Sequence, residues 1–375
     1  MVGQLIVQPG LLCIVLCSIV LCTALKDQRG QARVNWKLQS RPQNHTQPSY
    51  YLFTLEELNS TMGHCEMSIY GEALYQHLLV HPRRTSNSKV AKLGIMPPFM
   101  AYERHWPWYW KPADNIAKPG ADCYTATVVQ ARHLYESYVA DHRLPTGFFI
   151  TLVDMDPHWF HEVDTAVYGD PLFSWAKLNL LDKHFRPHRD ISMPPPATER
   201  LMRYKSDMRD MSKKKYWVTF QGSFKRDPLR AKLAKLHNSS AGIIISDSST
   251  SFFRPFRRHS YDYDDLMGSS KFTLVVRGDA EYSYRFTEAV CSGAVPVLLA
   301  DGWVPPFSTL VPFQTYGVQI QEKDWQHLVQ RLLEVDDQKW LDMQQSALAF
   351  CHNHLVSVHH QFQTMLDLLL SDEIE

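Results

Sequence analysis

Residues 276–289, with the sequence VRGDAEYSYRFTEA, contain the densest concentration of groups that could bind an anion. Gly278 lets the backbone turn close to a ligand, and Arg277 and Arg285 carry guanidinium groups suited to bidentate contact with phosphate. We expect Ser283 to cap a helix, whose first turn would point free N–H groups at an anion. This combination predicts a site for phosphate groups.

A carboxylate follows at a spacing that extends this site. Glu288 lies three residues after Arg285, so the two share one helix face, and a carboxylate there can accept hydrogen bonds from ribose hydroxyls. Phosphate arginines with a ribose carboxylate one turn further on describe a nucleotide site; the alternative is an ordinary surface pair. Gly222, Lys225 and Arg230 close a second loop that could add phosphate contacts, although alone they would be solvated surface.

The elements that must position these residues are clearest in the second half of the chain. Apolar runs alternate with segments that predict helices, which is typical of a parallel sheet covered on both faces. In such sheets ligands bind beyond the carboxyl ends of the strands. The predicted strands are Tyr216–Gln221, Gly242–Ser246, Phe272–Val276 and Val295–Leu299, and the predicted helices are 227–237, 261–269, 283–293 and much of 328–370.

An earlier lobe is predicted over residues 64–195. It is expected to contain a helix at Ile69–Val80, strands at Lys92–Met96 and Gly147–Val153, and a helix near Tyr124–Ala140. Three consecutive prolines at 194–196 can neither continue a helix nor donate to a sheet. Residues 196–215 are therefore expected to be a hinge before a second lobe at 216–375.

The amino-terminal residues carry an address signal. Residues 5–25 are apolar and about as long as a membrane-spanning helix needs to be, and charges begin at Lys26. Residues 1–25 are interpreted as a signal-anchor or a cleaved signal peptide, and residues 26–63 as a stem. The basic residues after the segment lie on the wrong side for a signal-anchor by the positive-inside rule. Either interpretation sends the remaining chain into the secretory pathway.

Composition and cysteine content limit the remaining classes. The chain has 375 residues, 39 Lys and Arg against 39 Asp and Glu, and 45% hydrophobic residues. This excludes a disordered chain and gives no long-range field for nucleic acid. Four cysteines outside the apolar segment could form up to two disulfides in three pairings, and three possible glycosylation sites agree with a luminal location: Cys65, Cys123, Cys291 and Cys351, with Asn44, Asn59 and Asn238.

Several stretches, in this order, resemble the exostosin family of glycosyltransferases. They cover about residues 150–325: FRPHRDISMP at 185–194, KYWVTFQG at 215–222, YDYDDLMGSSKFTLVVRG at 261–278, SYRFTEA at 283–289, GAVPV at 293–297 and DGWVPPF at 301–307. The chain is too short for the second transferase domain of the heparan-sulfate polymerases, so it resembles a single-domain member.

The resemblance implies an α/β protein of the GT-B type, with two Rossmann-like lobes, a cleft between them and a signal-anchor helix. It implies a type II Golgi membrane protein that transfers a sugar from a UDP-sugar to a glycan or glycoprotein, with inversion. Arg285 would neutralise the diphosphate, Glu288 would hold the ribose, and the Ser283 helix would add amide groups. These charged and amide groups would take the place of a metal ion, so we expect neither Asp154-Met155-Asp156 nor Asp262-Tyr263-Asp264 to bind one. Manganese is possible but not implied, and no tightly bound cofactor is expected.

An inverting displacement needs a general base for the acceptor hydroxyl. Asp154, Asp156 and His158 follow the predicted strand at 147–153, and Asp190 is a further candidate; Asp156 and His158 are favoured. The alternative is a catalytically silent family member that binds a glycan or a partner transferase as a scaffold. The donor sugar, the acceptor and any homo- or hetero-oligomer with another transferase stay open.

Overall fold

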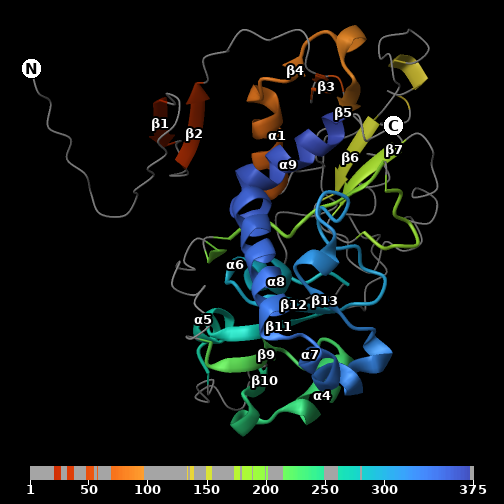
Figure 1. Ribbon diagram of the computed structural model, residues 1–375. Helices are drawn as coiled ribbons and strands as arrows, with labels where there is room; N and C mark the ends of the chain where they lie inside the picture. The colour runs from red at the N-terminus through yellow and green to blue at the C-terminus, as the bar shows by residue number, and fades with distance from the viewer. Residues whose placement is uncertain are drawn as a thin grey trace, which may run out of the picture. The chain divides into compact units, whose positions relative to one another are not determined.

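The structure is a computed structural model, and it describes residues 21–26, 32–37, 48–54, 57, 69–96, 133, 136–138, 149–153, 173–177, 180–187, 189–198, 200–201, 214–248, 261–278 and 281–371 (Figure 1). The chain divides into two units, residues 1–45 and 46–375. In the first unit, β1 (Leu21–Lys26) pairs antiparallel with β2 (Ala32–Lys37). The predicted signal-anchor helix lies outside the described residues up to position 20, and its last residues belong to β1 rather than to a helix. None of the helices in the described ranges is long and apolar enough to span a membrane.

The amino-terminal lobe of the second unit is built on a parallel sheet of six strands. Their spatial order is β4 (Arg84–Thr85), β3 (Tyr50–Leu52), β5 (Leu93–Ile95), β6 (Phe149–Val153), β7 (Phe173–Lys177) and β8 (Ile191–Ser192). Helix α1 (Ile69–Val80) has the predicted bounds, and β5 and β6 lie within the predicted strands. Of the helix expected at 124–140, residues 133 and 136–138 are described, and they are helical.

Strand β3 begins this lobe earlier than the sequence analysis predicted. Residues 26–63 were expected to be a stem, but Tyr50, Leu52 and Phe53 are buried in the lobe. The Tyr50 hydroxyl donates a hydrogen bond of 2.7 Å to the carbonyl oxygen of Leu78 in α1. The packed lobe therefore includes the residues of β3.

The carboxyl-terminal lobe contains a parallel sheet of five strands. Their spatial order is β10 (Ile243–Asp247), β9 (Tyr216–Gly222), β11 (Ser270–Val276), β12 (Val295–Leu299) and β13 (Val318–Gln319). The four predicted strands are confirmed, and β13 is an addition. The chain runs from β9 to one side of the sheet and then crosses to the other side. This doubly wound order places the topological switch point between β9 and β11.

Helices cover both faces of this sheet. They are α4 (Pro228–Leu233), α5 (Tyr263–Gly268), α6 (Arg285–Cys291), α7 (Leu328–Leu333), α8 (Asp337–Phe350) and α9 (Val358–Leu370), with a short π-helical segment at Cys351–Leu355. Successive residues of a strand face opposite ways, and Val275 packs in one core cluster with α6 and α9. Leu274 packs in the other cluster with α4 and α7. The expectation of an α/β protein with two parallel-sheet lobes is confirmed.

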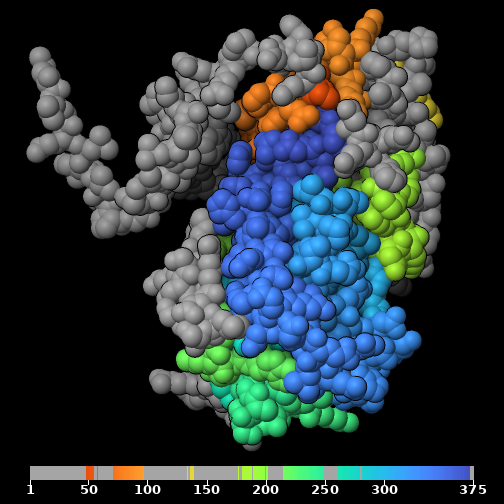
Figure 2. Space-filling model, in the orientation of Figure 1, coloured from red at the N-terminus to blue at the C-terminus, as the bar shows by residue number. Residues whose placement is uncertain are grey.

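The last helix connects the two lobes. In Figure 1, α9 lies beside α1, and the Arg83 guanidinium, just beyond α1, forms an ion pair of 3.0 Å with Asp367 of α9. Figure 2 shows the surface of the C-terminal helices, in blue, meeting the orange surface of the amino-terminal lobe. Although α9 belongs to the range predicted as the second lobe, its residues also pack against the first.

Candidate active site

The topological switch point is lined by two glycine loops and a buried arginine. Strand β9 ends at Gly222, and Gly278 follows the end of β11. A Cβ atom added at Gly278 would lie 3.1 Å from Nη2 of Arg230, and one added at Gly222 would lie 2.9 Å from Cζ of Phe220. The two loops therefore approach these side chains more closely than a larger residue allows.

Arg230 was predicted either to add phosphate contacts or to be solvated surface, and the structure buries it, so the solvated alternative is wrong. Its guanidinium donates hydrogen bonds to three backbone carbonyl oxygens, those of Arg277 (2.8 Å), Val276 (3.0 Å) and Ser223 (3.3 Å). Arg230 comes from α4, whose start matches prediction, since Asp227 caps it through the N–H of Leu229. The result is a permanent positive charge buried beneath both loops.

Arg285 begins α6 and is also buried. Its Nη2 donates to the carbonyl oxygen of Gln221 on β9, and its guanidinium lies 4.6 Å from the Phe220 ring centroid and 5.7 Å from that of Tyr263. Within the described ranges, no carboxylate forms an ion pair with it. Two buried atoms, Nε of Arg285 and Oε1 of Gln221, have no hydrogen-bond partner among the residues that the structure describes. A buried cation with an unused donor is suited to an anionic ligand.

Glu288 is held by partners other than Arg285. Its Oε2 accepts a hydrogen bond from the Tyr263 hydroxyl, and its Oε1 lies 3.4 Å from Nη1 of Arg200. Burial raises the pKa of the Tyr263 phenol, so the hydroxyl keeps its proton and remains a donor. Because Arg285 is buried and bound to β9, the alternative of a helical surface pair with Glu288 is wrong. Each carboxylate oxygen retains acceptor capacity for a further donor.

The two aspartates beside Tyr263 have partners within the protein. Asp262 caps α5 by accepting the N–H of Asp265 at 2.8 Å, and Asp264 forms an ion pair of 3.3 Å with Arg200. In the described ranges, no group of three or more His, Cys, Asp or Glu residues is placed to hold a metal ion.

Two further residues that were predicted to bind the phosphate groups have positions that differ from expectation. Arg277 is half-exposed and forms ion pairs with Asp227 (2.9 Å) and Glu322 (3.4 Å), which already balance its charge. The prediction that Ser283 caps α6 is wrong: Tyr284 occupies the cap position, and it is the Ser283 carbonyl that accepts the N–H of Phe286, at 3.0 Å. Lys225 is exposed.

The candidate bases divide into two groups. Asp154, Asp156 and His158 lie outside the described residues, just after β6. Asp190 is buried, and both of its carboxylate oxygens accept hydrogen bonds of 2.8 Å from the Arg186 guanidinium. A carboxylate fixed in a bidentate pair is a structural group, so the described geometry gives Asp190 a role in holding its loop.

Four residues that contact Arg285 or Glu288 were not predicted as part of the site. Phe220 and Gln221 were interpreted as part of an apolar strand, Tyr263 as the middle of a metal-like motif, and Arg200 as hinge. The available signal was positional, because Gln221 is the last residue of the predicted strand, directly before Gly222 at the switch point. Arg200 gave no such signal, since 88 residues separate it from Glu288.

The protein is a doubly wound α/β protein with two parallel-sheet lobes. A buried guanidinium and a carboxylate lie at the switch point of one sheet, where proteins of this class bind ligands. Residues 152–335 match the family model described as the Exostosin GT47 domain. This match supports an exostosin family glycosyltransferase, and every candidate site residue lies within the matched range.

Curated relatives share parts of the chain. It is 26% identical over 195 residues to the Exostosin-1 homolog of Caenorhabditis elegans, which covers 46% of this chain and 50% of that protein. It is 28% identical over 230 residues to Exostosin-1c of Danio rerio, which covers 52% of this chain and 27% of that protein. The chain thus spans half or less of the length of these relatives.

Solved structures show lower similarity. A crystal structure of WaaG, a glycosyltransferase involved in lipopolysaccharide biosynthesis, aligns with 86% of this chain and 100% of its own at a TM-score of 0.37 and 10% identity. Sucrose-phosphate synthase of Thermosynechococcus elongatus aligns with 86% of this chain and 98% of its own at 0.38 and 11% identity.

Proposed function

We propose that this chain is an inverting glycosyltransferase that moves a sugar from a UDP-sugar to a glycan or glycoprotein acceptor. The observation that carries the proposal is Arg285, a buried guanidinium with an unpartnered Nε, at the switch point of a parallel sheet. The match to the family model supports the reaction class. The neighbouring carboxylate of Glu288 supports a nucleotide as the donor.

The residues of the candidate site have separate roles in this proposal. Arg285 binds the diphosphate, and the buried charge of Arg230 stabilises the same anion from beneath the glycine loops. As the bond from the anomeric carbon to the phosphate oxygen breaks, negative charge grows on the leaving group, where fixed cations lower the barrier. Glu288, oriented by Tyr263, accepts hydrogen bonds from the ribose.

The acceptor side completes the displacement. The oxygen of an acceptor hydroxyl bonds to the anomeric carbon on the face opposite the leaving group, and the hydroxyl proton passes to a base. Asp156 or His158 is proposed for that base, with Asp154 as the remaining candidate. The step needs no oxidant or cofactor.

The proposed location is the Golgi membrane, with the catalytic part in the lumen and the apolar residues that precede β1 as the signal-anchor. The disulfide between Cys291 and Cys351 supports an oxidising compartment, because such bonds persist mainly there. Cleavage of the amino-terminal segment would instead give a secreted enzyme, and mass spectrometry of the mature chain distinguishes the two.

The function is tested by calorimetric titration of the purified full-length chain with UDP and a panel of UDP-sugars, with and without manganese. We expect UDP to bind and one UDP-sugar to be selectively hydrolysed or transferred. UDP binding without turnover of any sugar would favour the silent family member that acts as a scaffold. Absence of nucleotide binding by the folded chain would contradict the proposed donor site.

A further inference from the structure

Arg200 lies where the inter-lobe segment meets the candidate donor site. Its guanidinium contacts three groups there: the Glu288 carboxylate at 3.4 Å, the Asp264 carboxylate at 3.3 Å and the Tyr263 ring at 4.7 Å. The Arg200 side chain is 40% exposed, whereas that of Glu288 is 14% exposed. A cation from outside the sheet therefore covers a mostly buried carboxylate.

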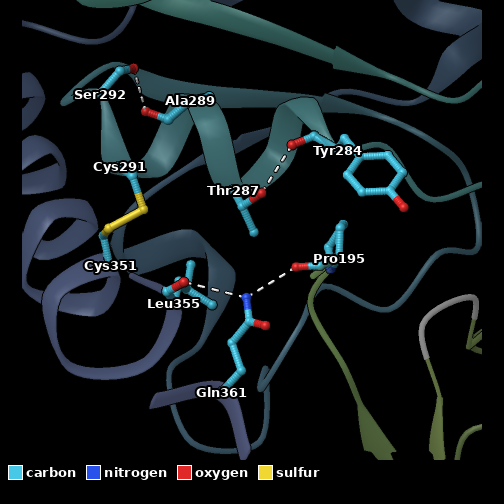
Figure 3. The surroundings of a disulfide bond; sticks show 9 residues. All are labelled: Pro195, Tyr284, Thr287, Ala289, Cys291, Ser292, Cys351, Leu355 and Gln361. Carbon is cyan, nitrogen blue, oxygen red and sulfur yellow. Dashed lines mark hydrogen bonds between the residues drawn. A yellow bond between two sulfur atoms is a disulfide. The ribbon is translucent and has the colours of Figure 1, made fainter. Parts of the chain in front are cut away.

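A buried amide fixes the segment that carries Arg200. Gln361 of α9 is fully buried; its Nε2 donates to the carbonyl oxygen of Pro195 at 3.0 Å, and its Oε1 accepts the N–H of Ala197 at 3.3 Å. Figure 3 shows the Gln361 amide between Pro195 and Leu355, whose carbonyl oxygen accepts a second bond of 3.3 Å. Because proline offers no N–H, these bonds are well placed to hold an extended proline segment.

The contacts around Glu288 define what Arg200 can do. Tyr263 occupies one oxygen of the carboxylate and Arg200 approaches the other, so the group is held from both sides. Both partners donate, which leaves the carboxylate an acceptor towards any third donor. An oriented carboxylate binds a hydroxyl with less loss of side-chain entropy than a free one.

We propose that Arg200 is a positioning residue of the donor site, which orients the Glu288 carboxylate towards the ribose hydroxyls of a nucleoside diphosphate. Gln361 supports this role by fixing the segment before Arg200. The inference rests on the proposed function and adds to it a residue from the inter-lobe segment, four residues beyond the proline run at 194–196.

The test compares UDP with a UDP analogue that lacks both ribose hydroxyls. Calorimetry on the full-length chain would measure both affinities for the wild type, Arg200→Gln and Glu288→Gln. We expect Arg200→Gln to weaken UDP binding roughly threefold to fivefold, since the pair is partly exposed, and to leave the analogue unchanged. Arg200→Lys should recover part of the affinity for UDP.

Lys215→Gln is the matched control. Lys215 is an exposed cation that pairs with Asp265 of α5, the helix that also carries Asp264, a partner of Arg200. Gln361→Met, which removes both bonds to the proline segment, should weaken UDP binding in the same hydroxyl-dependent way. A general structural defect would weaken UDP and the analogue equally.

The outcomes separate the inference from the proposed function. If Glu288→Gln weakens UDP binding and Arg200→Gln does not, the role of Arg200 is overturned and the donor site stands. If Arg200→Gln weakens UDP and the analogue equally, Arg200 acts as a general cation and the inference fails. If UDP does not bind the wild type, both the donor site and the inference fail.

Discussion

Two regions of this molecule bury ionisable side chains. One buries them in the charged form, and the other buries them in the neutral form. At the switch point of the carboxyl-terminal sheet, Arg230 and Arg285 are both buried and both donate to backbone carbonyl oxygens. At the junction of α1 and α9, the His77 ring lies 5.4 Å from the ring of His81 and 5.1 Å from that of His359. Burial there, together with these neighbouring imidazoles, lowers the pKa of His77 to about 3.

The difference follows from the chemistry of the side chains. A guanidinium cannot lose its proton in a protein, so the fold must supply oxygen atoms and aromatic faces around it. An imidazole instead sheds its proton when it is buried, and the junction stays neutral at that position. We therefore expect anions to bind at the switch point, and the stability of the junction of α1 and α9 to depend on pH.

The largest effect on stability is expected from the disulfide that ties α6 to the C-terminal helices. The bond joins Cys291 at the end of α6 to Cys351, with a sequence separation of 60, as Figure 3 shows. Replacing both with alanine should lower the free energy of unfolding by about 4 kcal/mol through chain entropy, measured by denaturant titration. Reduction of the wild type serves as the control and should shift the midpoint similarly; an unchanged midpoint in the variant would contradict this role.

A smaller loss is expected when the buried charge at the switch point is removed. Arg230→Met leaves the carbonyl oxygens of Ser223, Val276 and Arg277 without their shared donor, at a cost of about 2–3 kcal/mol. Arg331→Met, on the exposed face of α7, is the matched control and should change stability by less than about 0.5 kcal/mol. Equal stability of the two variants would show that the switch point does not depend on this cation.

The smallest effect is the pH dependence at the junction of α1 and α9. Because the pKa of His77 is lower in the folded chain, the unfolded chain binds more protons between about pH 6.5 and pH 3, and stability falls as pH falls through that window. Burial also lowers the pKa values of His81, His354 and His360, in the same direction. Arg83 lowers the pKa of His81, whereas Asp367 raises it.

His77→Leu should reduce the stability lost between pH 7 and pH 5 by at most about 2 kcal/mol, measured by denaturant titration at each pH. His327→Leu, at an exposed position before α7, is the control for the replacement of a histidine by leucine. A His77 variant with the wild-type pH profile would move the acid sensitivity elsewhere.

Sequence reasoning succeeded where the signal was local. The apolar run at β12 and the Asp227-Pro228 start of α4 each depend on neighbouring residues, and both were predicted. Strands β4, β8 and β13 have two residues each, too few for any periodicity to register.

The same contrast holds within the candidate site. Arg285 and Glu288 were found because they are three residues apart on one helix. Tyr263 and Arg200 meet Glu288 only through the fold, from 25 and 88 residues away. The cap was misplaced because Ser283 bonds through its carbonyl, which no side-chain preference reveals.

The most direct test of the central claim is the affinity of UDP for the full-length chain with Arg285 replaced by glutamine. If the buried cation at the switch point binds the diphosphate, Arg285→Gln should weaken binding by roughly a hundredfold, because a hydrogen-bonded charge pair in a buried site is lost. Arg331→Gln, the exposed control, should bind UDP like the wild type. Wild-type affinity in a folded Arg285→Gln chain would contradict the assignment of this site.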